Sequence, residues 1–478
     1  MPRGRGPALR TDARSPASSG CRAAATADRG AGAGTLTVRV RLCPAKGIFA
    51  LYKSGERPHM RSPEKEAQAL RRARRRLTDR LDSPWGWEVG MADTFGSAAA
   101  LLGIRSPEHP VVCVRPHLIE ARARRVLAAF PGDVLYAVKC NDTPIVLESL
   151  WRGGVRHFDT ASIGEVRLVR RLLPQARCHF MHPVKSAEAI AEAYHRHGVR
   201  RFVFDHEDEL AKIVAATDRA RDLELFLRLA VPGQGALLAL TGKFGVEREE
   251  AVRLLRRARG VAAELGLTFH VGSQCIDPEA FARAIAIAAE VAHAVGGVEH
   301  LDVGGGFPAR YKGDEPEFEA FVTRIVGAVV AHGLNCRLQC EPGRLLVADG
   351  ASVLTRVELR RGRSLYLNDG VYGNLAELKW IGPQFPIRLL RPSGPVEGET
   401  ADFDLYGPTC DSVDSMPGPH RIVREVGEGD WLEVGMMGAY SNALRTRFNG
   451  FTNEAVAILR DHGWYLEAPR HEAAALAA

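Results

Sequence analysis

The feature that most constrains the fold is a regular alternation of short apolar segments with amphipathic segments, which begins near residue 133. Each apolar segment has the length and composition of a buried strand, and each following segment has helical spacing. The predicted strands are 134–139, 157–162, 178–184, 201–206, 223–231, 268–273, 300–306 and 337–343. The predicted helices are 144–154, 164–174, 186–198, 208–220, 248–266, 278–297 and 318–333. Eight strands alternating with seven helices predict an α/β protein with a (β/α)8 TIM barrel over residues 118–345.

The remaining chain divides into three parts. Beyond residue 345 the helical period disappears, and strand-like segments predict a C-terminal β-domain, a sandwich or barrel, over residues 346–478. Residues 91–117 contain an apolar segment, 111–114, which we expect to join this β-domain as a strand. Residues 1–90 are rich in Ala, Arg, Gly, Ser and Pro, and we expect a disordered basic extension. A transit peptide, or sequence upstream of a true start at Met60 or Met91, is the alternative.

Charge and cysteine content narrow the class of protein. The formal charge is +7, but residues 1–90 hold 19 Lys and Arg against 8 Asp and Glu, so the remainder is slightly acidic. No zinc pattern or aromatic-rich basic motif indicates nucleic-acid binding, and no apolar stretch is long enough for a membrane span. The nine scattered cysteines contain no C-x-x-C pair, which favours free thiols in a reducing compartment and hence the cytoplasm.

Polar or glycine residues end each predicted barrel strand. They are Lys139, Asp159, His182, Asp205, Arg228, His270 with Ser273, Gly304 to Gly306, and Glu341. The carboxyl ends of barrel strands converge on one mouth, where the active sites of such barrels are built. A strand-end lysine can simply extend its ammonium to water, and a lone histidine is commonly a core residue. Eight polar strand ends in a row instead predict a site.

Two glycine motifs predict that this site holds a phosphate. "DVGGGFP" at 302–308 can bring backbone N–H groups close to an anion, and "EPGR" at 341–344 adds a glycine and Arg344. A lysine facing such a cradle suggests a Schiff base between Lys139 and pyridoxal 5′-phosphate. Glu341 is placed to hold the pyridine nitrogen in its protonated form, and His270 to stack on the ring. No metal is expected.

Eight motifs in order resemble the ornithine/lysine/diaminopimelate decarboxylase family, and the closest resemblance is to ornithine decarboxylase. They are "YAVKCN", "FDTAS", "FHVGSQC", "DVGGGFP", "EPGR", "NDGVYG", "GPTCDSVD" and "GAYSNALRTRFNGF", and the resemblance extends from about residue 108 to about residue 465. The family consists of fold type III pyridoxal-phosphate enzymes that share their barrel with alanine racemase. The resemblance implies decarboxylation of a basic L-amino acid, most simply L-ornithine to putrescine and CO2 in polyamine biosynthesis, with lysine to cadaverine as the alternative.

The resemblance also implies a role for each site residue. Lys139 would carry the cofactor, Glu341 would pair with its ring nitrogen, and His270 would stack on the ring. The phosphate would be held by Ser273, Gly304, Gly305, Gly306, Gly343, Arg344 and Tyr440. Asp159 and Glu165 would support the lysine and the surroundings of the ring. Cys410 would supply a proton at the reacting carbon. One departure is Ala239, where family members often carry an arginine, which puts fine tuning of the cofactor site in doubt.

The charges expected around the distal end of the substrate predict the substrate class. A diaminopimelate pocket needs a cation for a second carboxylate, and relatives with that substrate typically show Cys-Glu-Ser where this chain has Cys410-Asp411-Ser412. Asp369 and Asp411 instead suit the distal ammonium of a diamino acid. An alanine-racemase-like enzyme would want a tyrosine base and an arginine at the ring nitrogen, which Glu341 argues against. A decarboxylase-like regulator without activity would be expected to lack several of these residues.

The resemblance finally implies a head-to-tail homodimer with shared active sites. Lys139, His270 and Glu341 would come from one subunit, and Cys410, Asp411 and Asp369 from the β-domain of the other. A small basic amino acid is the expected substrate, and neither nucleic acid nor a membrane is an expected partner.

Overall fold

A computed structural model describes residues 93–466, apart from residues 234, 241, 383–384 and 452–454. All described residues belong to the unit Ser83–Ala478. The extension predicted for residues 1–90 therefore lies outside the described part of the chain. Within that part, every helix is too short or too polar to cross a membrane.

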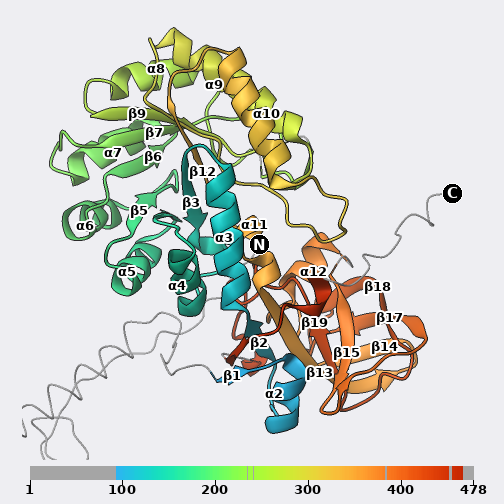
Figure 1. Cartoon of the computed structure of the whole chain (residues 1–478). Coiled ribbons are helices and arrows are strands. Elements are labelled where there is room, and N and C mark those ends of the chain that lie inside the picture. Colours follow the sequence, from blue (N-terminus) through green and yellow to red (C-terminus); the bar gives the residue numbers. More distant parts are fainter. Residues whose placement is uncertain (1–92, 234, 241, 383–384, 452–454, 467–478) are drawn as a thin grey trace, which may run out of the picture. The chain divides into compact units, whose positions relative to one another are not determined.

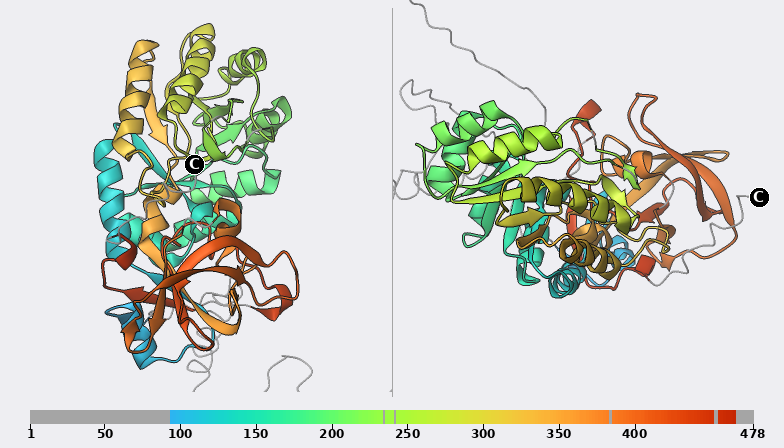
Figure 2. Two further views of the ribbon diagram at one scale, coloured as in Figure 1. Left: turned by 90° about the vertical axis from the view of Figure 1, so that its right-hand side faces the viewer. Right: turned by 90° about the horizontal axis from the view of Figure 1, so that it is seen from above.

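Eight parallel strands close into a barrel in the order β11-β12-β3-β4-β5-β6-β7-β9, which confirms the predicted (β/α)8 fold (Figure 1). The strands are β3 (Asp133–Ala137), β4 (His157–Thr160), β5 (Arg177–Phe180), β6 (Arg201–Phe204), β7 (Glu224–Arg228), β9 (Glu264–Thr268), β11 (His300–Asp302) and β12 (Arg337–Cys340). The helices between and beside them are α3 (Pro116–Ala129), α4 (Pro144–Arg152), α5 (Ile163–Leu172), α6 (Ala187–His197), α7 (Glu207–Ala216), α8 (Arg248–Ala258), α9 (Pro278–Ala294), α10 (Phe318–Ala331) and α11 (Arg344–Val347). Figure 2 shows these helices around the outside of the barrel.

Local sequence explains where the barrel helices begin. The Ser162 hydroxyl accepts a hydrogen bond from the Glu165 amide at the start of α5, and Ser186 does the same at the start of α6. The predicted helix over 248–266 is too long, because α8 ends at Ala258 and β9 begins at Glu264. Residues 264–268 pair with both β7 and β11, so barrel closure overrides the helix-forming composition of this stretch.

Strands from both sides of the barrel sequence build the β-domain, and Figure 1 shows the blue N-terminal strands beside the orange-to-red C-terminal ones. They are β1 (Thr94–Phe95), β2 (Val111–Val114), β13 (Ala351–Arg361), β14 (Ser364–Leu367), β15 (Ile387–Arg391), β16 (Gly394–Pro395), β17 (Thr400–Tyr406), β18 (Ser415–Val423), β19 (Trp431–Val434) and β20 (Val456–Leu459). The N-terminal β2 lies between β13 and β20. Two short elements, α2 (Ala98–Ile104) and α12 (Ala376–Ile381), accompany the sheet.

A buried arginine fixes the junction between the two domains. Arg115, directly before α3, is 0% exposed and donates to Glu433 at 3.0 Å and to Ser352 at 2.9 Å. Its guanidinium also pairs with Asp461 and lies 3.3 Å from the Tyr465 hydroxyl. A buried charge with this many partners is tolerated, whereas removing a partner is strongly destabilising. The barrel therefore starts from a fixed position on the β-domain.

Candidate active site

Lys139 lies at the barrel mouth, two residues after the end of β3 and not within the strand, where it was predicted. β3 ends at Ala137, and Lys139 lies in the short 3-10 helix η1 (Val138–Cys140). Its Nζ donates to Asp159 Oδ2 at 2.8 Å, and that carboxylate is 2% exposed. Burial lowers the pKa of Lys139, but Asp159, Glu341 and Tyr440 outweigh it and raise the pKa above its ordinary value. The lysine is therefore an ammonium here and must lose a proton before it can act as a nucleophile.

The three glycines after β11 allow backbone segments to approach one another closely. A Cβ on Gly304 would lie 2.0 Å from the Phe269 oxygen, and one on Gly306 would lie 2.2 Å from the Gly272 oxygen. Both glycines also have positive φ, 67° and 101°. Any side chain here would be strained and would collide with backbone oxygens of the neighbouring segment, so the glycines let the backbone approach closely, as a phosphate cradle requires.

Three residues predicted to hold a phosphate do come together. Arg344 is 4% exposed, and its Nη2 lies 3.4 Å from the Ser273 hydroxyl. Its guanidinium carbon lies 4.9 Å from the ring centre of Tyr440. The structure also adds two partners that the sequence did not indicate, because Nη1 donates to the Tyr311 hydroxyl at 2.9 Å and pairs with Glu377. Among the described residues, Arg344 Nε has no hydrogen-bond partner although it is buried.

Glu341 follows β12 and is 5% exposed. Its Oε1 is buried without a hydrogen-bond partner among the described residues. Burial, then Asp302 and Asp159, raise the pKa of this carboxyl well above its usual range. Asp302, the last residue of β11, is a neighbouring carboxyl whose charge contributes to this raised pKa, and it was not among the predicted site residues. An unpartnered buried carboxyl oxygen is costly unless a ligand donates to it.

His270 lies after β9 beside the same mouth. Its Nδ1 accepts a hydrogen bond from the Gly272 amide at 3.0 Å. Burial, Arg228 and Lys139 lower the pKa of His270 to about 3, so the ring is neutral near pH 7. A Cβ on Gly305 would lie 3.3 Å from its Nε2, so glycine at this position leaves room beside the ring. Arg228, which ends β7, is a second nearby charge that the predicted site residues did not include.

Glu165 lies in the first turn of α5, beside the group around Asp159. Its Oε2 accepts from the Ala161 amide at 2.7 Å. Burial, aided by the charge of Asp159, raises the pKa of Glu165 to about 7. The side chain is thus held in place at the mouth and changes charge near neutral pH.

The three predicted site residues of the β-domain lie in a different setting. Asp369 is 4% exposed, and burial raises its pKa to about 6 although it accepts from the Asn374 amide and side chain at 2.9 and 2.8 Å. Asp411 accepts from the Tyr372 hydroxyl at 2.5 Å, which lowers its pKa. Cys410 is exposed, with Sγ 3.7 Å from Asn449 Oδ1. In the described part of the chain, none of the three forms a hydrogen bond or ion pair with Lys139, His270 or Glu341.

A small cavity lies beside Asp369. It has a volume of about 80 Å³, and Asp369, Tyr372, Asn374 and Asp414 are among its lining residues. Asp411 is attached to the wall of this cavity through the Tyr372 hydroxyl. The β-domain thus has carboxylates around one small cavity. Among the described residues of a single chain, no hydrogen bond or ion pair joins this cavity to Lys139.

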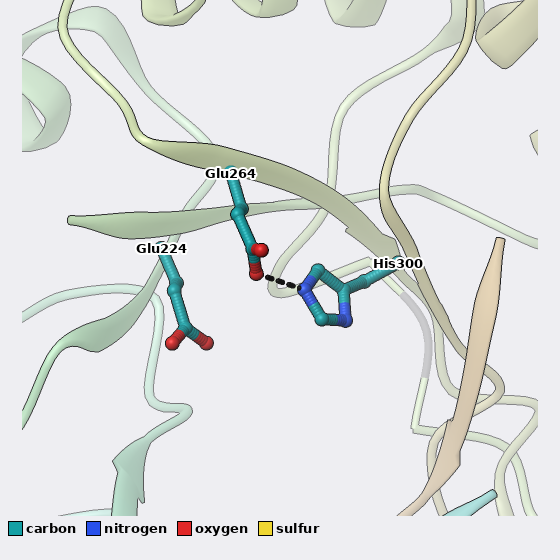
Figure 3. Close-up of side chains that lie close together, drawn as sticks. All are labelled: Glu224, Glu264 and His300. Atoms are coloured by element: carbon teal, nitrogen blue, oxygen red, sulfur yellow. Dashed lines mark hydrogen bonds and ion pairs between the residues drawn. The ribbon is translucent and has the colours of Figure 1, made fainter. Parts of the chain in front are cut away.

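A second polar cluster, Glu224, Glu264 and His300, lies at the opposite end of the barrel strands (Figure 3). These residues begin β7, β9 and β11, and His300 Nε2 lies 2.6 Å from Glu264 Oε2. Arg201 pairs with Glu224 at 2.6 Å, and Arg337 pairs with Glu264 at 2.5 Å. Because each carboxylate already has a guanidinium partner, the charges balance without a metal ion.

Known proteins resemble this chain over the barrel and the β-domain. The family model "Pyridoxal-dependent decarboxylase, pyridoxal binding domain" matches residues 117–348. Decarboxylase flvG of Aspergillus flavus is 34% identical over 352 residues, 68% of this chain and 79% of the relative. Ornithine decarboxylase of Mus musculus is 33% identical over 360 residues, 68% of this chain and 75% of the relative. The solved lysine/ornithine decarboxylase of Vibrio vulnificus in complex with putrescine covers 76% of this chain and 99% of its own, with 29% identity and a TM-score of 0.65.

The residues at the mouth fit pyridoxal 5′-phosphate. Glu341 Oε1 and Arg344 Nε are buried polar atoms that lack partners among the described residues, as expected for groups that contact a ligand. The glycine backbone at 304 and 306 packs too closely on neighbouring backbone oxygens to accept a Cβ, and Lys139 Nζ lies 2.8 Å from the Asp159 carboxylate. With the family match and the curated relatives, these features show that the chain belongs to the fold type III, pyridoxal-phosphate-dependent decarboxylases of basic amino acids, close to ornithine decarboxylase.

Proposed function

We propose that the protein converts L-ornithine to putrescine and CO2, as a step of polyamine biosynthesis in the cytoplasm. The observation that carries the substrate class is Asp369 in the lining of a small cavity of the β-domain, with Asp411 hydrogen-bonded to Tyr372 of the same lining. A diamino acid presents a distal ammonium, and two carboxylates suit it through charge-assisted hydrogen bonds. The seven described cysteines are all free thiols, which supports a reducing compartment.

The barrel residues would bind and orient the cofactor, which when bound supplies an electron sink for breaking the bond to the α-carboxylate. Lys139 would anchor it, and Asp159 would hold the lysine in position through their 2.8 Å contact. Glu341 would keep a proton at the ring nitrogen, and neutral His270 would pack against one face of the ring. Gly304, Gly305, Gly306, Gly343, Ser273, Arg344 and Tyr440 would hold the phosphate.

Cys410 would complete the reaction by delivering the proton that replaces the lost carboxylate at the α-carbon. The thiol is exposed, and its Sγ lies 3.7 Å from Asn449 Oδ1, so it is open to a substrate presented by another surface. A positioned general acid of this kind contributes about 10²- to 10⁴-fold to rate. The roles of Lys139 and Cys410 thus require two surfaces to be brought together.

A head-to-tail homodimer would bring them together. Around Cys410 the β-domain exposes a set of large apolar side chains, here called the Cys410 surface: Trp380, Val413, Leu444, Phe448 and Phe451. At the barrel mouth a second set is exposed: Val184, Leu237, Leu240 and Ile276. Contiguous apolar surface commonly marks a protein interface, and a two-fold axis would use each set twice.

The proposal is tested by assaying L-ornithine, L-lysine, L-arginine and meso-diaminopimelate in parallel and identifying the amine formed. We expect kcat/KM to be highest for ornithine, with putrescine as the product. Lysine is the second candidate, since one methylene changes discrimination by only about 1–3 kcal/mol. Cadaverine as the main product would identify lysine as the preferred substrate. If no substrate yields an amine, a regulator without activity is favoured.

A further inference from the structure

Three polar side chains lie side by side inside the barrel, directly below the candidate cofactor site. Thr268, Asp302 and Gln339 are partners in register across the neighbouring strands β9, β11 and β12. Their exposures are 2%, 0% and 0%. In the described part of the chain, Thr268 Oγ1, Asp302 Oδ2 and Gln339 Oε1 all lack a hydrogen-bond partner. Most buried polar atoms are paired, so three orphans in one row require an explanation.

Glu341 adds a fourth unpartnered atom to this row. It lies two residues after Gln339, so it shares the inward face of that chain segment. Its Oε1 is buried without a hydrogen-bond partner among the described residues, and its amide donates to the Gly304 oxygen at 2.8 Å, which brings Glu341 beside the segment that follows Asp302. Asp302 Oδ1 is already used, because it accepts from the Gly304 amide at 2.9 Å. Two carboxylates that meet in a buried site cannot both ionise, so the pair must hold a proton.

We propose that Asp302 is a positioning residue that shares one buried proton with Glu341, and that Thr268 and Gln339 keep the pair in place. The inference rests on the role proposed above for Glu341 as the partner of the pyridine nitrogen. Burial raises the pKa of both carboxyls, and each also feels the charge of Asp159, which agrees with a retained proton.

The cationic side chains near Asp302 and Glu341 are already paired with other carboxylates, so they do not neutralise these two. Lys139 is bound to Asp159 at 2.8 Å, and Arg201 is bound to Glu224 at 2.6 Å. From below, the Gln339 amide lies 3.1 Å from His300 Nδ1, and His300 Nε2 lies 2.6 Å from Glu264 (Figure 3). The Gln339 amide nitrogen is therefore used in the contact with His300. Its Oε1 has no hydrogen-bond partner among the described residues.

The proton shared by Asp302 and Glu341 is a source for the proton on the ring nitrogen. A site that already holds a proton between Asp302 and Glu341 can protonate a pyridine nitrogen without taking a proton from solvent. The positive charge that the nitrogen would then carry compensates the second carboxylate charge, which the pair cannot hold alone. Replacing Asp302 by asparagine removes the second carboxylate, and with it one cause of the raised pKa of Glu341, but preserves the shape of the side chain.

The test measures protons rather than turnover. The full-length protein is stripped of cofactor and titrated by calorimetry, in buffers of different ionisation enthalpy, with 4′-deoxypyridoxine 5′-phosphate. This probe keeps the ring nitrogen and the phosphate but has no aldehyde to react with Lys139. We expect Asp302→Asn to take up about one more proton per site than the wild type on binding. The 1-deaza form of the probe, which lacks the nitrogen, should show no such difference.

Controls separate this inference from the proposed function. Asp205→Asn changes another strand-end aspartate, one that accepts from the Gly245 amide at 2.9 Å, and should leave the proton count unchanged. Glu341→Gln should weaken binding of the probe but not of its deaza form. Equal binding of the probe by this variant and the wild type would contradict the role proposed for Glu341. Equal proton counts for wild type and Asp302→Asn, with Glu341→Gln behaving as expected, would overturn the shared proton alone.

A measurement on the wild type covers the case in which Asp302→Asn does not fold. Infrared spectra of the cofactor-free protein should show the carbonyl stretch of a protonated carboxylic acid that persists above the pH at which Glu165, with its pKa raised to about 7, has ionised. Disappearance of that band together with Glu165 would contradict a proton retained by Asp302 and Glu341.

Discussion

The two halves of the candidate site differ in how completely one chain builds them. At the barrel mouth, Asp159, Glu341 and Arg344 are 2%, 5% and 4% exposed and are held by residues from several strands. In the β-domain, Cys410 is exposed, and Asp411 accepts hydrogen bonds from the Tyr372 hydroxyl and the Val413 amide. The cofactor half is thus preorganised, whereas the half that would bind the distal amine and deliver a proton needs another surface to face. Breaking each half should therefore produce a different defect.

The largest effect is expected from Lys139→Ala, which breaks the preorganised half. Without the lysine, the visible absorbance of the bound cofactor should be lost and kcat should fall by several orders of magnitude, about 10³-fold or more. Absorbance spectra and a CO2-release assay check both results. Lys312→Ala, which changes an exposed lysine, is the matched control and should behave as wild type. Near-normal turnover by Lys139→Ala would remove the assignment of the barrel mouth as the active site.

Cys410→Ala breaks the other half and should separate turnover from cofactor binding. We expect kcat to fall by about 10²- to 10⁴-fold, because a general acid is lost, while the visible absorbance and the affinity for the cofactor stay unchanged. Steady-state kinetics and cofactor titration give the two readouts. Cys336→Ala, a half-buried thiol between α10 and β12, serves as the control. Loss of cofactor affinity in Cys410→Ala would show that the two halves are not functionally distinct.

Asp411→Ala sharpens the comparison by affecting substrate binding alone. Loss of a charge-assisted contact to the distal ammonium should raise KM for the diamino acid by about 30-fold or more and leave cofactor spectra unchanged. Asp404→Ala, on an exposed position of β17, is the matched control. An unchanged KM would mean that the distal amine binds elsewhere.

Asp369 predicts a pH dependence of substrate binding. Burial raises the pKa of this carboxyl from its ordinary value to about 6, so it is ionised above that pH and neutral below it. An ammonium needs the ionised form, so KM should rise as pH falls through 6, by about tenfold at pH 5. The dependence is measured from KM across the range, and Asp369→Asn should flatten it. A wild-type KM that is constant from pH 7 to pH 5 would exclude Asp369 from the ammonium site.

The same contrast explains what the sequence could predict. The barrel and the convergence of Lys139, Asp159 and Glu341 follow from strand periodicity, because strand ends of a parallel barrel meet at one mouth. The contact between Asp302 and Glu341 depends on the register of β11 against β12, which periodicity does not specify. The partners of Arg344, Tyr311 and Glu377, come from distant segments, so no spacing rule could assign them.

The smallest expected effect tests whether the two halves belong to different subunits. Lys139→Ala and Cys410→Ala proteins, each inactive alone, are mixed and allowed to exchange subunits. In a mixed dimer with shared sites, one site carries both defects and the other carries neither. Random pairing makes half of the dimers mixed, and one site in two of these is intact, so activity should recover to about a quarter of wild type. Exchange is verified by mass spectrometry of differently tagged chains. If mixed dimers form and no activity returns, Lys139 and Cys410 act within one subunit, and the exposed setting of Cys410 has to be explained by movement of its own loop.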